Sequence, residues 1–382
     1  MELKILRRSD LLPRIGVVVG TRPGIIKFAP VIKELQRRNA DFTLIHTGQH
    51  YSPGMDSVFF EDLELPAPHH VNGNVASRRL HGEQTAAMIV GVERAVLRDR
   101  PAVVVVGGDA NTNLAAALAV RKLASVQLAH MEAGLRSGDW SMPEEHNRIM
   151  IDHIAEILFV PTEQSRRNLE RDNVQGRIIY TGNTIVDAVQ QNRELAARKS
   201  RILDDLQLVP HKYILVTCHR EENVDQEAVL RRIVDNLVRF ADEHGPLVFP
   251  MHPRTHRRLA EFGIAGQLEA VGTIRITDPL NYLDMLQLMS HARAILTDSG
   301  GIQEEACILK VPCLTIRENT ERPETIDAGS NLVVGTDIDV WRRGLAEFEG
   351  RNRYDWENPY GDGEAARRIV DELVRVADEI GT

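Results

Sequence analysis

The sequence predicts an α/β protein with two doubly wound parallel sheets, one in each half of the chain. Short apolar runs recur along the sequence and alternate with segments of helical periodicity. The runs are almost continuously apolar, as expected of strands that are buried on both faces of a parallel sheet. The length of 382 residues corresponds to about two domains.

Each apolar run is followed by Gly, Asp, Thr or Ser and then by a helical pattern. The runs of the first half are Ile15–Val19, Phe42–Ile45, Val103–Val106, Val126–Leu128, Ile157–Val160 and Ile178–Tyr180. The runs of the second half are Tyr213–Thr217, Leu247–Pro250, Ile274–Ile276, Ala294–Thr297, Cys313–Ile316 and Leu332–Val334. Between them, Arg231–Ala241 and Tyr282–Met289 carry apolar side chains at helical spacing, so one face of each can pack on a sheet.

The polar stretch Asn192–His211 is typical of a crossing from one domain to the next. We therefore expect an N-terminal Rossmann-like domain over residues 1–190 and a C-terminal one over residues 191–362. The last helix, predicted within residues 363–382, is apolar along one face and is expected to join the N-terminal domain. Ligands of open parallel sheets bind beyond the carboxyl ends of the strands, so we expect the site in an interdomain cleft.

The composition excludes several classes of protein. The hydrophobic share of 43% and the charged share of 26% are ordinary for globular proteins, and the net charge of −9 gives no general support for binding nucleic acid or membrane surfaces. The segment Met1–Ile15 lacks the apolar stretch of a secretory signal, and no run is long enough to span a membrane. Three cysteines without C-x-x-C spacing fit a reducing compartment. We expect a cytoplasmic protein.

Basic side chains follow the first predicted strand at the start of a helix. Gly20 and Arg22 lie in the turn, Pro23 suits the first helical position, and Lys27 lies one turn further in. A helix N-terminus flanked by two cations can hold an anion; the alternative is a plain turn with Lys27 in solvent. The segment matches neither the Walker loop nor G-x-G-x-x-G, so it does not indicate ATP or NAD, and we expect no cofactor.

A Ser-Gly-Gly turn follows the strand Ala294–Thr297 in the second half. It consists of Ser299, Gly300 and Gly301, and a helix is expected from Ile302. Consecutive N–H groups in such a turn are typical of diphosphate binding, although the turn could be only a helix cap. Arg317 and Arg322 follow the next strand and could neutralise a phosphate. Glu305 could accept hydrogen bonds from sugar or ribose hydroxyls.

Carboxylates follow other strands of the first half at the same predicted edge. Asp109 and Glu132 each follow a strand, and Glu144 begins a helix that places Arg148 on the same face at i, i+4. Each acid alone could be only a helix cap. Several carboxylates near a diphosphate would oppose its binding, so general acid–base catalysis explains the set better.

His219 follows the first strand of the second half, and we expect it to contact a phosphate. His252 and His256 have the i, i+4 spacing that metals use, but no convincing third ligand is near, so we expect no metal site. The pair His69–His70 lies in a loop-like stretch and is expected at the surface.

The motifs together resemble the non-hydrolysing UDP-N-acetylglucosamine 2-epimerase family. They are GTRPG-IIK (Gly20–Lys27), TGQHY (Thr47–Tyr51), GD (Gly108–Asp109), HMEAGLRS (His130–Ser137), MPEEHNR (Met142–Arg148), GNTIVD (Gly182–Asp187), HREEN (His219–Asn223), LTDSGGIQEEA (Leu296–Ala306) and TERPE (Thr320–Glu324). They occur in the order of the family from Gly20 to about Gly335. The resemblance implies a glycosyltransferase-B fold, a nucleotide sugar in the interdomain cleft, and usually a homodimer.

The resemblance also implies roles for individual residues. The positions that would bind UDP are Arg22, His219, Ser299, Gly300, Gly301, Glu305 and Arg322. The positions that would surround the sugar and carry or support proton transfer are Lys27, Asp109, Glu132, Glu144 and Arg148, with His219 as a further catalytic candidate. The sequence departs from the family's pattern at Gly24, where Glu is usual, at Met131, and beside Asp109 at Gly107 and Ala110-Asn111. None of these departures removes a proposed catalytic group.

The chemistry of an acetamido sugar favours elimination, because its C2 hydrogen is not next to a carbonyl and an NAD fingerprint is missing. A base would remove the C2 proton while UDP leaves C1, and UDP would then add back with protonation from the other face. Four alternatives remain: a hydrolysing epimerase, a 2-epimerase of a UDP-diacetamido-uronic acid, a retaining glycosyltransferase, and a non-catalytic UDP-sugar sensor. Synthesis of cell-surface polysaccharide is the expected pathway.

Overall fold

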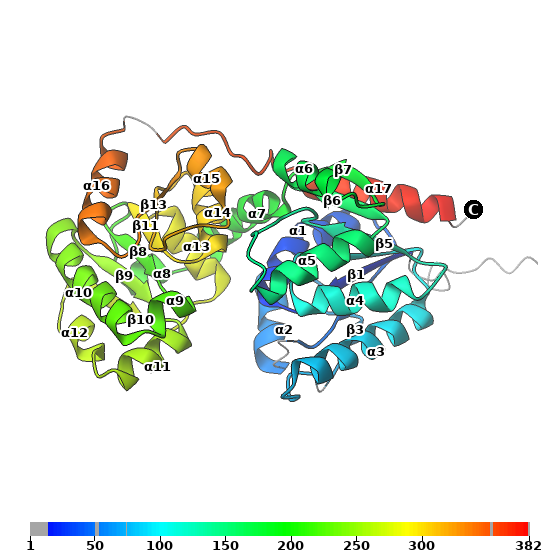
Figure 1. Ribbon diagram of the computed structural model, residues 1–382, viewed down its shortest axis with the longest axis horizontal. Coiled ribbons are helices and arrows are strands. Elements are labelled where there is room, and N and C mark those ends of the chain that lie inside the picture. The colour runs from blue at the N-terminus through cyan, green and yellow to red at the C-terminus, as the bar shows by residue number, and fades with distance from the viewer. Residues whose placement is uncertain (1–13, 50–52, 74, 352–353, 381–382) are drawn as a thin grey trace, which may run out of the picture. The chain divides into compact units, whose positions relative to one another are not determined.

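The computed structural model of the protein describes residues 14–49, 53–73, 75–351 and 354–380 (Figure 1). Two compact units divide the chain: one runs up to Ala188 and takes in the segment from Tyr360 onward, and the other is Val189–Pro359. Within the described residues each unit is built on one parallel sheet, of seven strands in the first and six in the second. The predicted α/β fold with two doubly wound sheets is confirmed.

The first sheet reverses its direction of winding in the middle. Its strands are β1 (Ile15–Val19), β2 (Phe42–His46), β3 (His70–Val71), β4 (Val103–Gly107), β5 (Gln127–Met131), β6 (Ile157–Val160) and β7 (Arg177–Tyr180). They are ordered β3-β2-β1-β4-β5-β6-β7 and every neighbouring pair is parallel. The strand order therefore reverses between β1 and β4, which is the position where open α/β sheets bind ligands.

Helices cover both faces of this sheet. The helices of the first unit are α1 (Arg22–Arg37), α2 (Pro53–Asp62), α3 (His81–Asp99), α4 (Asn111–Arg121), α5 (Pro143–Ile154), α6 (Glu163–Arg171) and α17 (Ala365–Ile380), while α7 (Thr184–Lys199) begins in the first unit and continues into the second. Val104 and Val106 of β4 pack with α3 and α4, while Gly107 on the alternate face lies against the ring of Phe28 of α1. The continuous apolar run of β4 is thus buried on both faces. The C-terminal helix α17 packs on α1, β1 and β4.

The second sheet repeats the same plan. Its strands are β8 (Ile214–Thr217), β9 (Leu247–Pro250), β10 (Ile274–Thr277), β11 (Ala294–Thr297), β12 (Cys313–Thr315) and β13 (Asn331–Val333), in the order β10-β9-β8-β11-β12-β13. Its helices are α8 (Ile202–Asp205), α9 (Glu221–Val224), α10 (Glu227–His244), α11 (Pro253–Glu261), α12 (Ala265–Glu269), α13 (Tyr282–Ser290), α14 (Gly300–Leu309), α15 (Pro323–Asp327) and α16 (Ile338–Glu349). Here the reversal lies between β8 and β11.

Some local expectations were wrong. His70 does not lie in a loop: it belongs to β3, and its Nε2 lies 2.6 Å from an oxygen of Asp99. A strand of two residues carries no periodicity signal, which explains the error. The stretch Asn192–His211, expected as the crossing between domains, contains the end of α7 and α8, and the two units divide just before it, between Ala188 and Val189.

Two other expectations fall on residues outside the described part of the chain. These are the lack of a targeting signal, which rests on residues 1–13, and the end of the TGQHY motif at His50 and Tyr51. Among the described residues, none of the helices has both the length and the apolar composition that crossing a membrane requires.

Candidate active site

The turn after β1 is built around Gly20. A Cβ atom at this position would lie 2.1 Å from the hydroxyl of Thr47 and 2.3 Å from that of Thr112, so any larger residue would displace them. Those two hydroxyls are hydrogen-bonded to each other at 2.8 Å. Helix α1 then begins at Arg22, one residue earlier than Pro23, with Thr21 as its N-cap, and Arg22 is exposed at this helix start.

Lys27 and Glu132 form an ion pair at the reversal of the sheet. Nζ of Lys27 lies 2.7 and 2.8 Å from the two carboxylate oxygens, and Asn183 donates to one of them at 3.2 Å. Glu132 is buried and has a φ of +62°. The left-handed conformation is unfavourable for a glutamate, and such residues cluster at functional sites where the surroundings enforce them. Packing of the chain thus aims this carboxylate at Lys27.

Asp109 follows β4 and binds Arg148 of α5. Nη2 of Arg148 lies 2.6 Å from Oδ2 of Asp109, and Asn147 donates to the backbone carbonyl of Asp109 at 2.8 Å. Burial would lower the pKa of the Arg148 guanidinium, but Asp109 and Glu145 raise it above its usual value. Arg148 therefore stays a cation. The Asp109 side chain is 41% exposed, so the carboxylate is accessible as well as paired.

Arg148 contacts Glu145 and not the predicted Glu144. The Glu145 carboxylate lies 2.6 Å from Nη1 of Arg148 and accepts from the backbone N–H groups of Ser137 and Gly138 at 2.9 and 3.2 Å. Burial would raise the pKa of Glu145, but these donors lower it overall. Glu144 is exposed. The expected i, i+4 pairing was wrong because Glu145 and Arg148, at i, i+3, are the two that face inward.

His219 in the second unit is held by a carboxylate that the sequence analysis did not single out. Asp298, fully buried after β11, accepts from the backbone N–H groups of His219 and Arg220 at 2.8 and 2.9 Å. Its other oxygen lies 3.1 Å from Nδ1 of His219. Burial would raise the pKa of Asp298, but His219 and the N–H groups lower it overall. Its place directly after a strand, as in Asp109, was the available signal.

His252 lies beside His219, with the ring centroids 5.1 Å apart. Its Nδ1 accepts from the backbone N–H of Arg254 at 3.2 Å and so caps α11. Burial, and then the charge of His219, lower the pKa of His252. Across the described residues there is no group of three or more His, Cys, Asp or Glu side chains placed to hold a metal ion.

The Ser-Gly-Gly turn forms the start of α14. Ser299 is the N-cap and the helix begins at Gly300, two residues before the expected start. A Cβ atom on Gly301 would meet none of the described atoms within 4 Å, whereas one on Gly300 would lie 3.2 Å from the Glu321 carboxylate. Packing within the second unit therefore does not require glycine at 301. The first N–H groups of a helix have no partner within the helix, so they can bind an anion.

Arg322 lies at the start of α15 and is paired with Glu304 of α14. Its Nε lies 2.7 Å from Oε1 of Glu304, a carboxylate that is almost completely buried. The predicted Glu305 points to a different partner, since it accepts from the hydroxyl of Tyr282 at 3.1 Å. Arg317 is buried and binds Glu222 at 2.7 Å. The sequence pattern indicated the two arginines but not Glu304.

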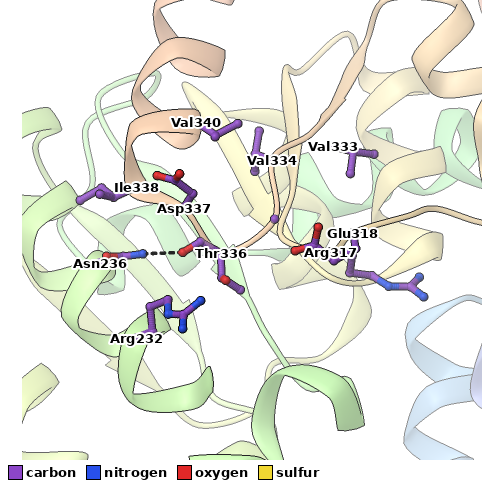
Figure 2. A pocket seen from close by; sticks show the side chains of 11 residues that line it. Arg232, Asn236, Arg317, Glu318, Val333, Val334, Thr336, Asp337, Ile338 and Val340 are labelled. Atoms are coloured by element: carbon purple, nitrogen blue, oxygen red, sulfur yellow. Dashed lines mark hydrogen bonds between the residues drawn. The ribbon is translucent and has the colours of Figure 1, made fainter. Parts of the chain in front are cut away.

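A separate cavity of about 660 Å³ lies in the second unit (Figure 2). Residues of α10, β13 and the start of α16 line it, and Asn236 donates to the backbone carbonyl of Thr336 at 2.8 Å. Arg232 and Arg317 also contribute to its wall. Among the described residues that line it, Arg317 was predicted to neutralise a phosphate, whereas none of the residues that the resemblance assigns to UDP is found.

Comparison with known proteins decides the family. The family model for UDP-N-acetylglucosamine 2-epimerase matches residues 33–374. The chain belongs to the UDP-N-acetylglucosamine 2-epimerase family. It is 45% identical over 361 residues to the UDP-N-acetylglucosamine 2-epimerase of Methanocaldococcus jannaschii, covering 94% of this chain and 98% of that one. It is also 35% identical to the UDP-2,3-diacetamido-2,3-dideoxy-D-glucuronate 2-epimerase of Pseudomonas aeruginosa, over 95% of this chain and all of that one.

A solved structure of the family has the same fold. The crystal structure of the M. jannaschii epimerase in complex with UDP-GlcNAc and UDP matches 94% of this chain and 99% of its own, with a TM-score of 0.84 and 44% identity. The fold that the resemblance implied is therefore confirmed, since it is the fold of an epimerase crystallised with UDP-GlcNAc and UDP.

Proposed function

We propose that the protein interconverts UDP-N-acetylglucosamine and UDP-N-acetylmannosamine by inverting C2 of the sugar, without releasing the free sugar. The observation that carries the proposal is the pair of acids at the reversal of the first sheet, Asp109 bound by Arg148 and Glu132 bound by Lys27. Inversion of C2 needs acid–base groups on both faces of the sugar. Membership of the family supports the choice of UDP-sugar.

The UDP part is assigned mainly to the second unit. The residues that we assign to it are Arg22, His219, Ser299, Gly300, Gly301, Glu305 and Arg322. N–H groups at the start of α14 suit a diphosphate, and Arg322 would neutralise part of its charge. Asp298 fixes the turn that carries His219, so this imidazole is held in place before a ligand binds.

The proposed reaction is an elimination followed by an addition. A carboxylate takes the C2 proton, the electron pair of that bond forms the C1–C2 double bond, and the C1–oxygen bond breaks with its electrons leaving on UDP. The same UDP then adds to C1 while C2 receives a proton on the opposite face. Cations and N–H groups around the diphosphate stabilise the charge that develops on the leaving oxygen.

Asp109, Glu132 and Glu144 are assigned to the proton transfers, with Lys27 and Arg148 as the cations that orient the first two. The pairing of Glu132 with Lys27 keeps a charge-stabilised carboxylate at the sheet reversal. Glu144 stands at the solvent-exposed start of α5, where a proton can be exchanged with water. Replacing Glu132 by Gln removes the proton acceptor and is expected to lower kcat at least about a hundredfold.

Proton NMR with UDP-N-acetylglucosamine in deuterated buffer, with no metal or NAD added, tests the proposal. UDP-N-acetylmannosamine with deuterium at C2 is the expected product, because the abstracted proton exchanges with solvent. Release of free N-acetylmannosamine and UDP would instead indicate a hydrolysing epimerase. Saturable binding without turnover would indicate a sensor.

A second candidate substrate is a UDP-diacetamido-uronic acid. The similarity to the P. aeruginosa enzyme that bears this substrate in its name favours it. Turnover of the uronic acid with no turnover of UDP-N-acetylglucosamine in the same assay would replace the first candidate by the second.

Assembly, domain roles and location complete the proposal. We assign acid–base chemistry to a first domain that includes the C-terminal helix, UDP binding to the second, and a homodimer as the working form. All three cysteines, Cys218, Cys307 and Cys313, are unpaired and buried, in keeping with a reducing cytoplasm. Light scattering of the purified protein, with a mass of one chain as the contrary result, tests the dimer.

A further inference from the structure

His130 of β5 is a buried histidine whose two ring nitrogens both face hydrogen-bond acceptors. Its side chain is 1% exposed. Nδ1 lies 2.7 Å from Oδ1 of Asp152 on α5, and Nε2 lies 3.1 Å from the backbone carbonyl oxygen of Gly108. A carbonyl has no proton to give, and neither does an ionised carboxylate. Both nitrogens must then donate, which requires a ring with two protons and a positive charge.

Asp152 meets the condition of being ionised through partners other than His130, one of which is a guanidinium. Its second oxygen accepts from Nη1 of Arg136 at 2.7 Å and from the backbone N–H of Gly134 at 3.1 Å. Arg136 in turn donates to Asp172 at 3.0 Å. Two cations and two anions balance within this network, so burial leaves no uncompensated charge.

The network holds both turns that carry the proposed acids. Gly108, whose carbonyl His130 binds, immediately precedes Asp109 and has a φ of +82°. Gly134, whose N–H Asp152 binds, lies two residues after Glu132 and has a φ of +79°. The N–H of Gly108 also donates to the carbonyl of Met131 at 3.1 Å. The two turns are therefore fixed to each other through the sheet and through one buried ion pair.

We propose that His130 is a positioning residue: as a doubly protonated ring paired with Asp152, it fixes the Gly108–Asp109 peptide and sets the position of Asp109 relative to Glu132. It does not touch the substrate, and it acts through the two turns. This inference rests on the proposed function, since it assumes that Asp109 and Glu132 are the reacting acids. Misplacing a catalytic group by about 1 Å can lower a rate about a hundredfold.

The chain offers a matched control in a second His–Asp pair of the same sheet. Nε2 of His70 lies 2.6 Å from Asp99 at the β3 edge, and Asp99 also accepts from Thr43 at 2.8 Å. This pair is partly buried but holds neither of the turns with the proposed acids. His70→Gln and His130→Gln each break a His–Asp pair. Only His130→Gln also removes a contact to Gly108.

The first measurement compares the kinetics of the two variants with the wild type. His130→Gln is expected to lower kcat about tenfold to a hundredfold, while KM for UDP-N-acetylglucosamine and the Kd of UDP stay within about twofold. His70→Gln is expected to keep kcat. A His130→Gln enzyme that folds and keeps wild-type kcat would overturn the proposal, and so would an equal loss of kcat in both variants.

The second measurement does not depend on turnover, and the charge state is observed in the wild-type protein. In wild-type protein labelled with ¹⁵N in its histidine rings, His130 is expected to show two slowly exchanging N–H signals at neutral pH, because both protons are buried in hydrogen bonds. Loss of these two signals in His130→Gln, with the signals of the other histidines unchanged, assigns them and shows that the variant is folded. A ring nitrogen of His130 without a proton would overturn the proposed charge state. Wild-type turnover separately decides the proposed function, so the two failures can be told apart.

Discussion

Replacing Lys27 by Met is the sharpest test of the ion pair at the reversal of the first sheet. The substitution keeps the length of the side chain and removes its charge. Within the described part of the chain, Glu132, whose side chain is 4% exposed, would keep only the hydrogen bond from Asn183 at 3.2 Å. A buried carboxylate left without its cation is the main source of instability when such a pair is broken.

The size of the effect follows from the burial of the two partners. Removing one partner of a fully buried pair costs about 3–5 kcal/mol. Lys27 is 22% exposed, so solvent already screens part of its interaction, and we expect a loss of about 2–3 kcal/mol. The matched control on the same helix is Arg37→Met, because Arg37 is 67% exposed in its pair with Glu34 and should hardly change stability.

Urea unfolding and kcat are measured on Lys27→Met, on Arg37→Met and on the double variant Lys27→Met/Glu132→Gln. The double variant should regain most of the lost stability, because an uncharged amide at position 132 no longer needs a cation. It should stay at least about a hundredfold below wild type in kcat. The reasoning would be refuted if Lys27→Met and Arg37→Met had the same free energy of unfolding. It would also be refuted if the double variant were no more stable than Lys27→Met.

Three further predictions concern the second unit and the start of α17. Gly301→Ala should fold with unchanged or higher thermal stability, because a Cβ there meets none of the described atoms within 4 Å and Ala is better than Gly in a helix by about 1 kcal/mol. The Kd of this variant for UDP, measured by calorimetry, should rise. An unchanged Kd would remove Gly301 from the proposed UDP site. Asp298→Asn should weaken UDP binding about tenfold, since it weakens three charge-assisted hydrogen bonds around His219. Equal affinity of the wild type and Asp298→Asn for UDP would speak against a role of His219 in UDP binding. Burial raises the pKa of Asp187 to about 6, although backbone N–H groups at the start of α17 oppose the shift. The folded state therefore binds this proton more tightly than the unfolded chain, and the contribution to stability is fully present below the usual pKa of Asp and is lost as pH rises through about 6; urea unfolding between about pH 4 and 7 should show this slope in wild type and lose it in Asp187→Asn.

The fold was predictable because its signal is carried by many residues at once. The run Val103–Val106 is apolar throughout, and its strand is buried on both faces, so periodicity and burial agree. The strand that escaped prediction, β3, has two residues and is held by a side-chain contact between His70 and Asp99 that joins distant parts of the chain. A contact of this kind leaves no local pattern in the sequence.

The sequence predicted where the candidate site residues lie in the fold better than it predicted their contacts. Asp109, Glu132 and His219 were proposed because ligands gather at the carboxyl ends of strands, and each of them does follow a strand. This rule did not reveal which of them are paired, because Lys27 and Glu132 are 105 positions apart and meet only once the sheet has formed. The left-handed backbone of Glu132 was equally hidden, since a glutamate gives no hint of a positive φ.

Two pairs of consecutive glutamates show why the details were lost and how they could have been found. Glu144 and Glu145 lie four and three residues before Arg148, and both spacings make neighbours on a helix, so the spacing alone does not choose between them. Helix α5 buries Glu145, Asn147, Arg148, Ile151 and Asp152, which is a stripe of helical period that excludes Glu144.

In the same way, Glu304 turns to Arg322 while Glu305 turns to Tyr282. In each pair a buried carboxylate fixes the plane of an arginine before any ligand arrives. This ordering lowers the conformational entropy that the arginine side chains would lose on binding the proposed diphosphate or sugar. Reading the burial stripe of a helix before assigning roles to its charges would therefore separate the glutamates that hold arginines from those left for the ligand.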